Sequence, residues 1–500
     1  MLSKLHSIAL TGLEGTRITV EVDLRPGKTS FVIVGLGDMA VQEARERVLS
    51  AIKNSGFRLP ATGKRVTVNL APADIRKEGP AYDLAIALGT LVASNQLDLE
   101  KLDEIGLVGE LALNGDLRHV NGILPLTMSA KQLGFKELIL PAMNADEASL
   151  IPGIKLCPVH NLLEVCQILR QERPRPALQP VRKNSFALNY NSDFAHIYGQ
   201  QQAKRALEIA AAGGHNVLFS GPPGSGKTML SKAFCSILPP LTQDEILETS
   251  KIYSVAGLLS KEHPIIDQCP FRAPHHTASS VSLVGGGRIP KPGEISLAHN
   301  GVLFLDEIPE FPKAVLEVLR QPLEERIVTI SRAQGSLTFP ASFILLAAMN
   351  PCPCGYLNDP DRQCTCPPYS IERYQSRLSG PFLDRIDLQV EVPKVSYDKL
   401  RGEEQSESSE SIRQRVSQAR NKQLARQGKV NSKLFTPELK KFAAIDELSH
   451  EILAKAVSKF SLSARACHRT IKLARTIADL EDQAKILTSH IAEALQYRMK

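Results

Sequence analysis

Apolar and polar positions in the first 170 residues of the chain follow two different periods. Strand-like runs lie at 31–34, 66–70 and 138–140, and amphipathic runs of helical period lie at 41–55, 84–94 and 125–133. A mixture of these two periods predicts an α+β unit. The proline-rich and charged stretch from Gln171 to Ser185 then breaks all apolar periodicity, which is typical of an exposed linker.

The middle of the chain contains short, fully apolar runs that end in glycine-rich or polar residues. The runs lie at 217–220, 301–305, 343–349 and 388–392. Such runs are typical of strands buried on both faces of a parallel sheet. A polar stretch at 401–411 follows, and the rest of the chain has a helical pattern. The predicted units are therefore residues 1–170, a linker at 171–192, an α/β core at 193–395 and a helical unit at 396–500.

Composition limits the classes of protein that fit this division. The 500 residues are 43% hydrophobic and 23% charged, so the chain can bury more than one core. Apolar stretches of the length that a membrane helix needs, about 20 residues, are absent, and the N-terminus lacks a signal-peptide pattern. We expect a cytoplasmic protein without a membrane partner. The net charge of +7 permits a polyanionic partner without requiring one.

The apolar run at 217–220 opens the strand–loop–helix setting of a P-loop. Glycines let backbone N–H groups wrap phosphates, a lysine neutralises the β- and γ-phosphate charge, and a threonine hydroxyl binds Mg²⁺. A chance glycine-rich turn is the alternative, and a second motif makes it remote. The predicted ATP-binding residues are Gly221, Pro222, Pro223, Gly224, Ser225, Gly226, Lys227 and Thr228.

The second motif is the apolar run at 301–305, which ends in the carboxylates Asp306 and Glu307. Ligands of open α/β sheets bind at the carboxyl ends of the strands, so both side chains are predicted to lie beside the P-loop. Asp306 is predicted to complete the Mg²⁺ shell with Thr228. Glu307 is predicted to orient and deprotonate the attacking water. Two carboxylates of a solvated loop are the alternative.

The order of these motifs resembles that of AAA+ ATPases. In that resemblance, Asn350 is similar to the sensor-1 residue, which holds the attacking water against the γ-phosphate. Arg385, in the stretch SGPFLDRID, resembles the arginine that reaches into the active site of a neighbouring subunit. A surface ion pair is the alternative for Arg385.

Further positions follow from the same resemblance. Arg465 resembles sensor 2, a lid arginine that reaches the γ-phosphate, although Arg469 lies four residues further along and could take that role. Ile197 and Gly199 resemble the segment that lies against adenine, where the contact is expected from the backbone.

The N-terminal unit resembles the Lon protease domain through the stretches Gly79-Pro80-Ala81 and Gly122-Ile-Leu-Pro125. In Lon-like proteases, a serine nucleophile and a lysine base occupy the places that Ala81 and Pro125 hold here. Neither side chain can attack a carbonyl or accept a proton. We therefore expect a scaffold or ring-forming domain, with intact protease activity as a remote alternative.

Two insertions narrow the resemblance. Residues 272–298 and the period-two stretch 327–339 resemble the helix-2 insert and the pre-sensor-1 hairpin of the AAA+ branch that holds magnesium-chelatase I subunits and MCM helicases. Together with the Lon-like front, they make the whole chain similar to the ComM/YifB family of magnesium chelatase-like proteins. That resemblance implies a homo-oligomeric, hexameric ring that uses ATP and Mg²⁺ to drive branch migration of single-stranded and branched DNA. The process implied is homologous recombination, as in natural transformation.

Basic residues of the two insertions are candidates for gripping DNA phosphates, namely Arg288, Lys291 and Arg332. The stretch 411–433 carries seven Lys and Arg residues and no acid, and it reads equally well as a DNA track or as a solvated lid face. A chelatase-type motor and a protein-remodelling chaperone are the alternative functions.

Four of the nine cysteines lie within residues 352–366. Four thiolates suit tetrahedral Zn²⁺, although the two C-x-C pairs are tighter than the commoner C-x₂-C spacing. We predict a structural zinc site, with unmetallated loop cysteines as the alternative. The predicted ligands are Cys352, Cys354, Cys364 and Cys366.

Overall fold

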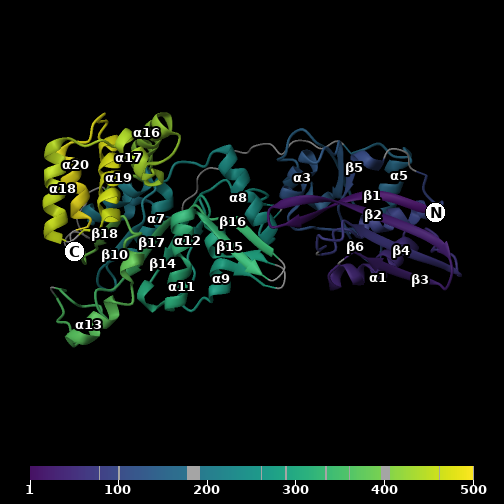
Figure 1. Cartoon of the computed structure of the whole chain (residues 1–500), viewed down its shortest axis with the longest axis horizontal. Helices are drawn as coiled ribbons and strands as arrows, with labels where there is room; N and C mark the ends of the chain where they lie inside the picture. The colour runs from purple at the N-terminus through teal and green to yellow at the C-terminus, as the bar shows by residue number, and fades with distance from the viewer. Residues whose placement is uncertain are drawn as a thin grey trace.

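The structure, a computed structural model, has three parts along its long axis: an N-terminal domain, an α/β core and a helical lid (Figure 1). It describes residues 1–35, 37–77, 79–98, 102–176, 192–260, 262–287, 290–332, 335–359, 361–395, 406–460 and 462–498. Most of the predicted linker, 177–191, is outside the described residues. Among the helices of the described residues, none is long and apolar enough to cross a membrane.

The N-terminal domain is built on a seven-stranded mixed sheet in the order β3-β4-β2-β1-β5-β8-β9. Apolar side chains of its strands and helices form two hydrophobic clusters, so the predicted α+β unit is confirmed. The strands are β1 (Leu2–Thr11), β2 (Glu14–Pro26), β3 (Ser30–Val34), β4 (Lys64–Ala71), β5 (Ile105–Leu107), β8 (Glu137–Pro141) and β9 (Lys155–Val159), with a small hairpin of β6 (Glu110–Leu111) and β7 (Leu117–Arg118). The helices are α1 (Met39–Asn54), α2 (Asp83–Ala93), α3 (Ile123–Gln132), α4 (Ala145–Ala148) and α5 (Leu162–Leu169).

The two positions that would hold a Lon-type serine and lysine lie in apolar surroundings. Ala81 packs against a cluster that includes Ile123 and Leu126 of α3. Pro125 is buried in the first turn of the same helix. Apolar packing at these positions agrees with the expectation of a domain without that nucleophile and base.

The α/β core contains a five-stranded parallel sheet in the order β11-β14-β17-β10-β18. Since all five strands run in the same direction, their carboxyl ends share one edge of the sheet and their amino ends share the other. The strands are β10 (Val217–Ser220), β11 (Phe271–Arg272), β14 (Val302–Leu305), β17 (Ile344–Met349) and β18 (Leu388–Glu391). The helices are α6 (Gln201–Gly213), α7 (Lys227–Ile237), α8 (Gln243–Ala256), α11 (Lys313–Val318), α12 (Arg320–Glu325), α13 (Pro368–Gln375) and α14 (Gly380–Leu383).

Both predicted insertions form small hairpins that lie against each other. The first contains α9 (Ser280–Val284), β12 (Gly285–Gly286), β13 (Lys291–Pro292) and α10 (Glu294–Leu297). The second is the antiparallel pair β15 (Ile327–Arg332) and β16 (Gly335–Pro340). Contact is tight, because a Cβ added at Gly285 would lie 3.2 Å from Cδ1 of Ile330.

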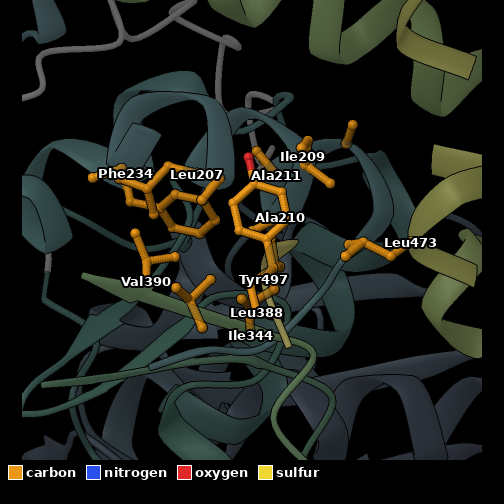
Figure 2. Close-up of a cluster of buried hydrophobic side chains, with 14 of the residues drawn as sticks. Leu207, Ile209, Ala210, Ala211, Phe234, Ile344, Leu388, Val390, Leu473 and Tyr497 are labelled. Carbon is orange, nitrogen blue, oxygen red and sulfur yellow. The ribbon is translucent and has the colours of Figure 1, made fainter. Parts of the chain in front are cut away.

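The lid is helical, as predicted, and shares a core with the sheet. Figure 2 shows Tyr497 directly above Leu388 and Ile344 of the sheet, with Leu473 of the lid to the right and α6 residues above, all in one hydrophobic cluster. Its helices are α16 (Ser409–Gln427), α17 (Thr436–Phe442), α18 (Glu447–Phe460), α19 (Ala464–Leu480) and α20 (Thr488–Gln496). This shared core fixes the lid beside β18, at one end of the sheet.

The N-terminal domain meets the core at α8 and at the β15–β16 hairpin (Figure 1). The backbone N–H of Gly122 donates to the carbonyl oxygen of Ser254, at 3.0 Å, and the Ser254 hydroxyl donates to the carboxylate of Glu147. Burial raises the pKa of Glu147 against the opposing effect of hydrogen bonds from the Ser254 hydroxyl and the backbone N–H of Leu124. The turn between β1 and β2 reaches the hairpin, where a Cβ at Gly12 would lie 3.7 Å from Leu337.

Candidate nucleotide site, arginine pair and metal centre

Four neighbouring strands deliver polar residues to the carboxyl edge of the parallel sheet. The P-loop follows β10, Asp306 and Glu307 follow β14, and Asn350 follows β17. His275 and His276 come shortly after β11 at the same edge. This edge is where open α/β sheets bind their ligands, so the predicted catalytic residues are brought together.

Glycines in the P-loop satisfy two specific requirements. A Cβ at Gly221 would lie 2.2 Å from the carbonyl oxygen of Val392, so only glycine fits between β10 and the end of β18. Gly226 has a φ of +90°, in the left-handed region, and α7 begins at the next residue. The loop therefore leads directly into a helix N-terminus, where backbone N–H groups are free to bind phosphate.

Lys227 lies buried beneath the loop. Its Nζ donates to the carbonyl oxygens of Gly221, at 2.7 Å, and Pro222, at 2.9 Å, and lies 3.4 Å from Oδ1 of Asn350. Burial lowers the pKa of Lys227, while the charges of Asp306 and Glu307 oppose that shift. A buried ammonium between the loop and the sensor-1 candidate is placed to meet the β- and γ-phosphates.

The two predicted Mg²⁺ residues are in direct contact. Thr228 Oγ1 donates to Oδ2 of Asp306 at 2.8 Å, and the other carboxylate oxygen accepts the backbone N–H of Glu307 at 3.0 Å. A hydroxyl and a carboxylate side by side are the oxygen donors that Mg²⁺ takes in P-loop proteins, so the residues present fit this ion. Mg²⁺ held there would neutralise charge on the phosphates.

Glu307 projects from a strained turn. Its φ of +51° lies in the left-handed region, which residues with a Cβ rarely adopt and which occurs at functional sites. The side chain is exposed, and its Oε2 lies 3.4 Å from Nδ1 of His276. The rings of His275 and His276 have centroids 4.1 Å apart. His276 therefore contacts the predicted base, a contact that the sequence analysis missed.

The predicted adenine segment lies beside the P-loop. Ile197 is buried, and its carbonyl oxygen accepts hydrogen bonds from Lys204 and from the hydroxyl of Ser406. Gly199 takes a φ of +62°, and the next residue, Gln200, donates to the carbonyl oxygen of Ser225 at 3.2 Å. The segment thus touches the P-loop through Gln200, and the adenine contact of Ile197 and Gly199 stays a prediction.

Arg385 lies at the opposite, amino edge of the sheet. Its carbonyl oxygen accepts from the side chain of Asn216, the residue before β10, at 3.0 Å. The guanidinium is buried and forms a 2.7 Å ion pair with the exposed side chain of Glu324. About 16 Å of extended chain separates Asn216 from Gly221, which is farther than one side chain extends. Arg385 cannot therefore serve the P-loop of its own chain.

Arg465 lies beside Arg385 and away from Lys227. It is 65% exposed on α19, and its guanidinium lies 3.7 Å from the same carboxylate of Glu324. Glu324 thus connects Arg385 and the sensor-2 candidate Arg465 at the amino edge. Their roles on a nucleotide stay predictions.

Arg469, the other sensor-2 candidate, is held in an ion pair with Asp387 at 2.6 Å. Burial would raise the pKa of Asp387, but the charge of Arg469 and a hydrogen bond from His215 hold it well below its usual range. This contact joins the lid to the start of β18 and leaves Arg469 far from the P-loop. Between the two candidates, the geometry favours Arg465 as the one free to reach a ligand.

The four clustered cysteines converge after Asn350. Their sulfur atoms all lie within 4.8 Å of one another, and Cys352 Sγ is 3.4 Å from that of Cys354 and 3.7 Å from that of Cys364. A zinc ion with tetrahedral Zn–S bonds of about 2.3 Å would need sulfurs about 3.8 Å apart. The separations fit that requirement, so the cluster is compatible with a structural zinc.

The cysteine loop also supports the nucleotide site. A Cβ at Gly355 would lie 2.7 Å from Cδ of Pro223, and the φ of Gly355 is +85°. The loop therefore packs directly on the P-loop, and any ion that orders its thiolates also holds this contact in place.

Of the DNA candidates, Lys291 is exposed on β13. Arg288 lies outside the described residues, as does the side chain of Arg332, whose backbone pairs with Gly335 at the end of β15. Most cations of 411–433 form ion pairs with carboxylates of the same chain, which agrees with the interpretation of this stretch as a solvated face of the lid. The ion pairs are Arg413–Glu410, Arg415–Glu208, Arg415–Glu407, Lys422–Asp482, Arg426–Asp479 and Lys429–Glu438.

Comparison with known proteins matches all three parts of the chain. Residues 193–400 match the family model described as magnesium chelatase, subunit ChlI. Residues 20–144 match subunit ChlI of Mg-chelatase, and 406–498 match the C-terminal part of magnesium chelatase subunit ChlI.

Full-length relatives give the same result. The competence protein ComM of Haemophilus influenzae is 47% identical over 99% of this chain and 97% of its own length. YifB of Escherichia coli is 45% identical over the same shares of the two chains. The Lon protease of Bacillus thuringiensis is 27% identical over 29% of this chain and 19% of its own length. The Lon-like front and the magnesium chelatase-like core are thereby confirmed.

Proposed function

We propose, since the chain belongs to the ComM and YifB family of magnesium chelatase-like AAA+ ATPases, that it is an ATP-driven motor acting on DNA. In this proposal, the protein forms a hexameric ring that promotes branch migration during homologous recombination. Integration of DNA taken up in natural transformation is the process in which it would act. The relative named competence protein ComM supports the connection with transformation.

The position of Arg385 is the observation that supports the proposed ring most directly. It lies at the amino edge of the sheet, beyond the reach of the P-loop of its own chain, and Arg465 lies with it on Glu324. Arginines serve phosphoryl transfer when they meet the γ-phosphate, and a neighbouring subunit can bring its P-loop to them. A ring then completes each site with two arginines from the next subunit.

Hydrolysis in such a site follows from the side chains at the carboxyl edge. Lys227 binds the β- and γ-phosphates, and Glu307, oriented by His276, takes a proton from the attacking water. Asn350 holds that water in line. Arg385 of the adjacent chain exchanges its partner Glu324 for the negative charge that develops on the γ-phosphate.

The DNA contact is proposed at the two insertion hairpins. Lys291 is exposed on the first hairpin, and the second hairpin lies directly against it. Both follow or precede strands whose ends hold the nucleotide, so a change of nucleotide state can move them. Phosphate contacts of this kind give little sequence preference and weaken steeply as salt rises.

The test measures ATPase activity with and without single-stranded DNA, and then branch migration of a four-strand junction. DNA should stimulate wild-type hydrolysis, and Lys291→Ala should lose that stimulation while basal ATPase activity is kept. Lys422→Ala is the matched control, because that lysine is an exposed lid cation paired with Asp482. The proposal is contradicted if DNA does not stimulate ATP hydrolysis and the protein does not promote branch migration of the junction.

One observation favours a second candidate, a chelatase-type motor, because all three family models carry the magnesium chelatase name. Under that function, a large protein partner and not DNA would stimulate hydrolysis. The same ATPase measurement separates the two candidates.

A further inference from the structure

A cavity of about 130 Å³ lies at the amino edge of the sheet, between the core and the lid. This volume is roughly ten times what one water molecule needs. Residues that precede the strands form its floor, among them Asn216, Cys269 and Phe343. Val430 and Ser432 of the lid close it from the other side. The cavity is thus separate from the nucleotide site, which occupies the carboxyl edge.

Four cations line this cavity: Arg326 from the core, and Arg420, Lys433 and Arg469 from the lid. Only Arg469 has an acidic partner among the ion pairs of the described residues, namely Asp387. Arg420 donates to the carbonyl oxygen of Ala211, and its Nε is buried without a hydrogen-bond partner. Within the described residues, the side chains of Arg326 and Lys433 form no hydrogen bond and no ion pair.

The carboxylates around the cavity are already engaged. Glu245 accepts from the backbone and hydroxyl of Thr242, at 2.8 and 3.0 Å, in the cap of α8. Asp387 accepts from Arg469 and from the backbone N–H of Asn216, at 2.6 and 3.0 Å. They attract the cations through space, but neither forms a direct ion pair with Arg326, Arg420 or Lys433 in the described part of the chain.

Positive charge in the cavity is therefore under-compensated. Burial, followed by the charges of Arg326 and Arg420, lowers the pKa of Lys433 to about 8. Burial also lowers the pKa of Arg326 and of Arg420, although Asp387 and Glu245 respectively oppose it. Arg326, Arg420 and Lys433 are partly buried. Cations without partners in such surroundings are costly, and an anion among them would remove that cost.

We infer that this cavity binds a small phosphate anion of the pyrophosphate or oligophosphate class, held by Arg326, Arg420 and Lys433. The guanidinium groups offer the planar forks that suit phosphate oxygens, and Lys433 adds a point charge. Because Arg326 belongs to the core and the other two belong to the lid, the anion joins the two bodies. Its binding therefore stabilises the lid on the core and sets the angle at which Arg465 is presented.

The test uses inorganic pyrophosphate as the probe and the full-length Lys227→Ala protein, in which loss of ADP binding is verified first. Calorimetric titration should detect one pyrophosphate per chain. Lys433→Gln and Arg420→Gln should each weaken this binding by at least about tenfold, since each removes a charge-assisted contact. Lys422→Gln, on the same lid helix as Arg420 but paired with Asp482, should bind as the parent does.

A thermal measurement guards against variants that merely fail to fold. Removing one of several mutually repelling cations should leave the Tm without pyrophosphate unchanged or higher, and should abolish the rise in Tm that pyrophosphate causes in the parent. Absence of binding to the parent at millimolar pyrophosphate, or equal binding by Lys433→Gln, overturns the inference. Displacement of pyrophosphate by a short single-stranded oligonucleotide also overturns it, because the site would then belong to DNA.

Discussion

The two edges of the same five-stranded sheet carry different sets of charged residues, and the proposed ring brings these two sets together. At the carboxyl edge, hydrogen bonds link Thr228 to Asp306 and Asp306 to the backbone of Glu307, and the charges of both carboxylates act on Lys227. At the amino edge, arginines cluster on a single carboxylate, Glu324. The first edge is built to receive phosphates, and the second has cations but no phosphate-binding loop of its own.

In the proposed ring, each chain supplies only part of a catalytic site. Parallel strands place every P-loop residue at one edge, so a residue that precedes a strand, such as Arg385, cannot reach the same edge. Variants at the carboxyl edge should therefore affect the chain that carries them, whereas variants of Arg385 should affect its neighbour.

Lys227→Ala should abolish nucleotide binding, because it removes the buried ammonium that lies under the P-loop. Titration with a fluorescent ATP analogue measures this. Lys232→Ala is the matched control, since Lys232 lies on the same helix, α7, and is exposed. If Lys227→Ala still binds the ATP analogue, the assignment of residues 221–228 as the nucleotide-binding loop is wrong.

Glu307→Gln should keep ATP binding and lower turnover by about 10³-fold, because general base catalysis contributes about 10²–10⁴-fold. The change keeps the size and the strained backbone of Glu307 and removes only the base. Steady-state hydrolysis by protein with verified ATP affinity is the measurement. Wild-type turnover would show that another group activates the water.

His276→Ala should lower kcat about tenfold with little change in ATP affinity, because it removes a polar contact to the charged base and not a contact to ATP. His276→Gln should recover part of the rate if its amide can still donate to Glu307. A loss in affinity that matches the loss in kcat would instead indicate a structural role.

Cys352→Ser with Cys354→Ser should release about one zinc per chain, since two thiolates cannot hold the ion. ATP affinity should fall only a few-fold, through the contact between Gly355 and Pro223. Metal analysis and ATP titration of the same samples measure both effects. Cys467→Ser, away from the cluster, is the control, and wild-type protein without zinc contradicts the metal assignment.

Local patterns predicted the P-loop and the strand that ends in Asp306, because each motif is contiguous and its chemistry depends on neighbours in sequence. The parallel sheet and the helical lid followed from apolar runs in the same way. Strands β1 and β2, the longest of the N-terminal domain, did not stand out. Buried polar residues such as Ser3, His6 and Ser7 interrupt the apolar pattern of β1.

Contacts between distant segments could not be predicted. His276 reaches Glu307 because β11 and β14 are neighbours, a fact of sheet order that the sequence does not display. The cations of 411–433 fitted a DNA track and a solvated lid face equally well, but Arg415 pairs with Glu208 and Lys422 with Asp482. Arg465 and Arg469 are equivalent by spacing, and only the ion pair of Arg469 with Asp387 distinguishes them.

Arg385→Ala should lower hydrolysis by about 10³-fold while each chain still binds ATP, because the arginine stabilises charge in the transition state. The direct test of the two-edge account mixes these subunits with Lys227→Ala subunits, which are inactive but keep Arg385. Mixed rings, isolated through a different affinity tag on each variant, should recover part of the wild-type ATPase activity. No recovery in such rings would contradict the account and place the function of Arg385 within its own chain.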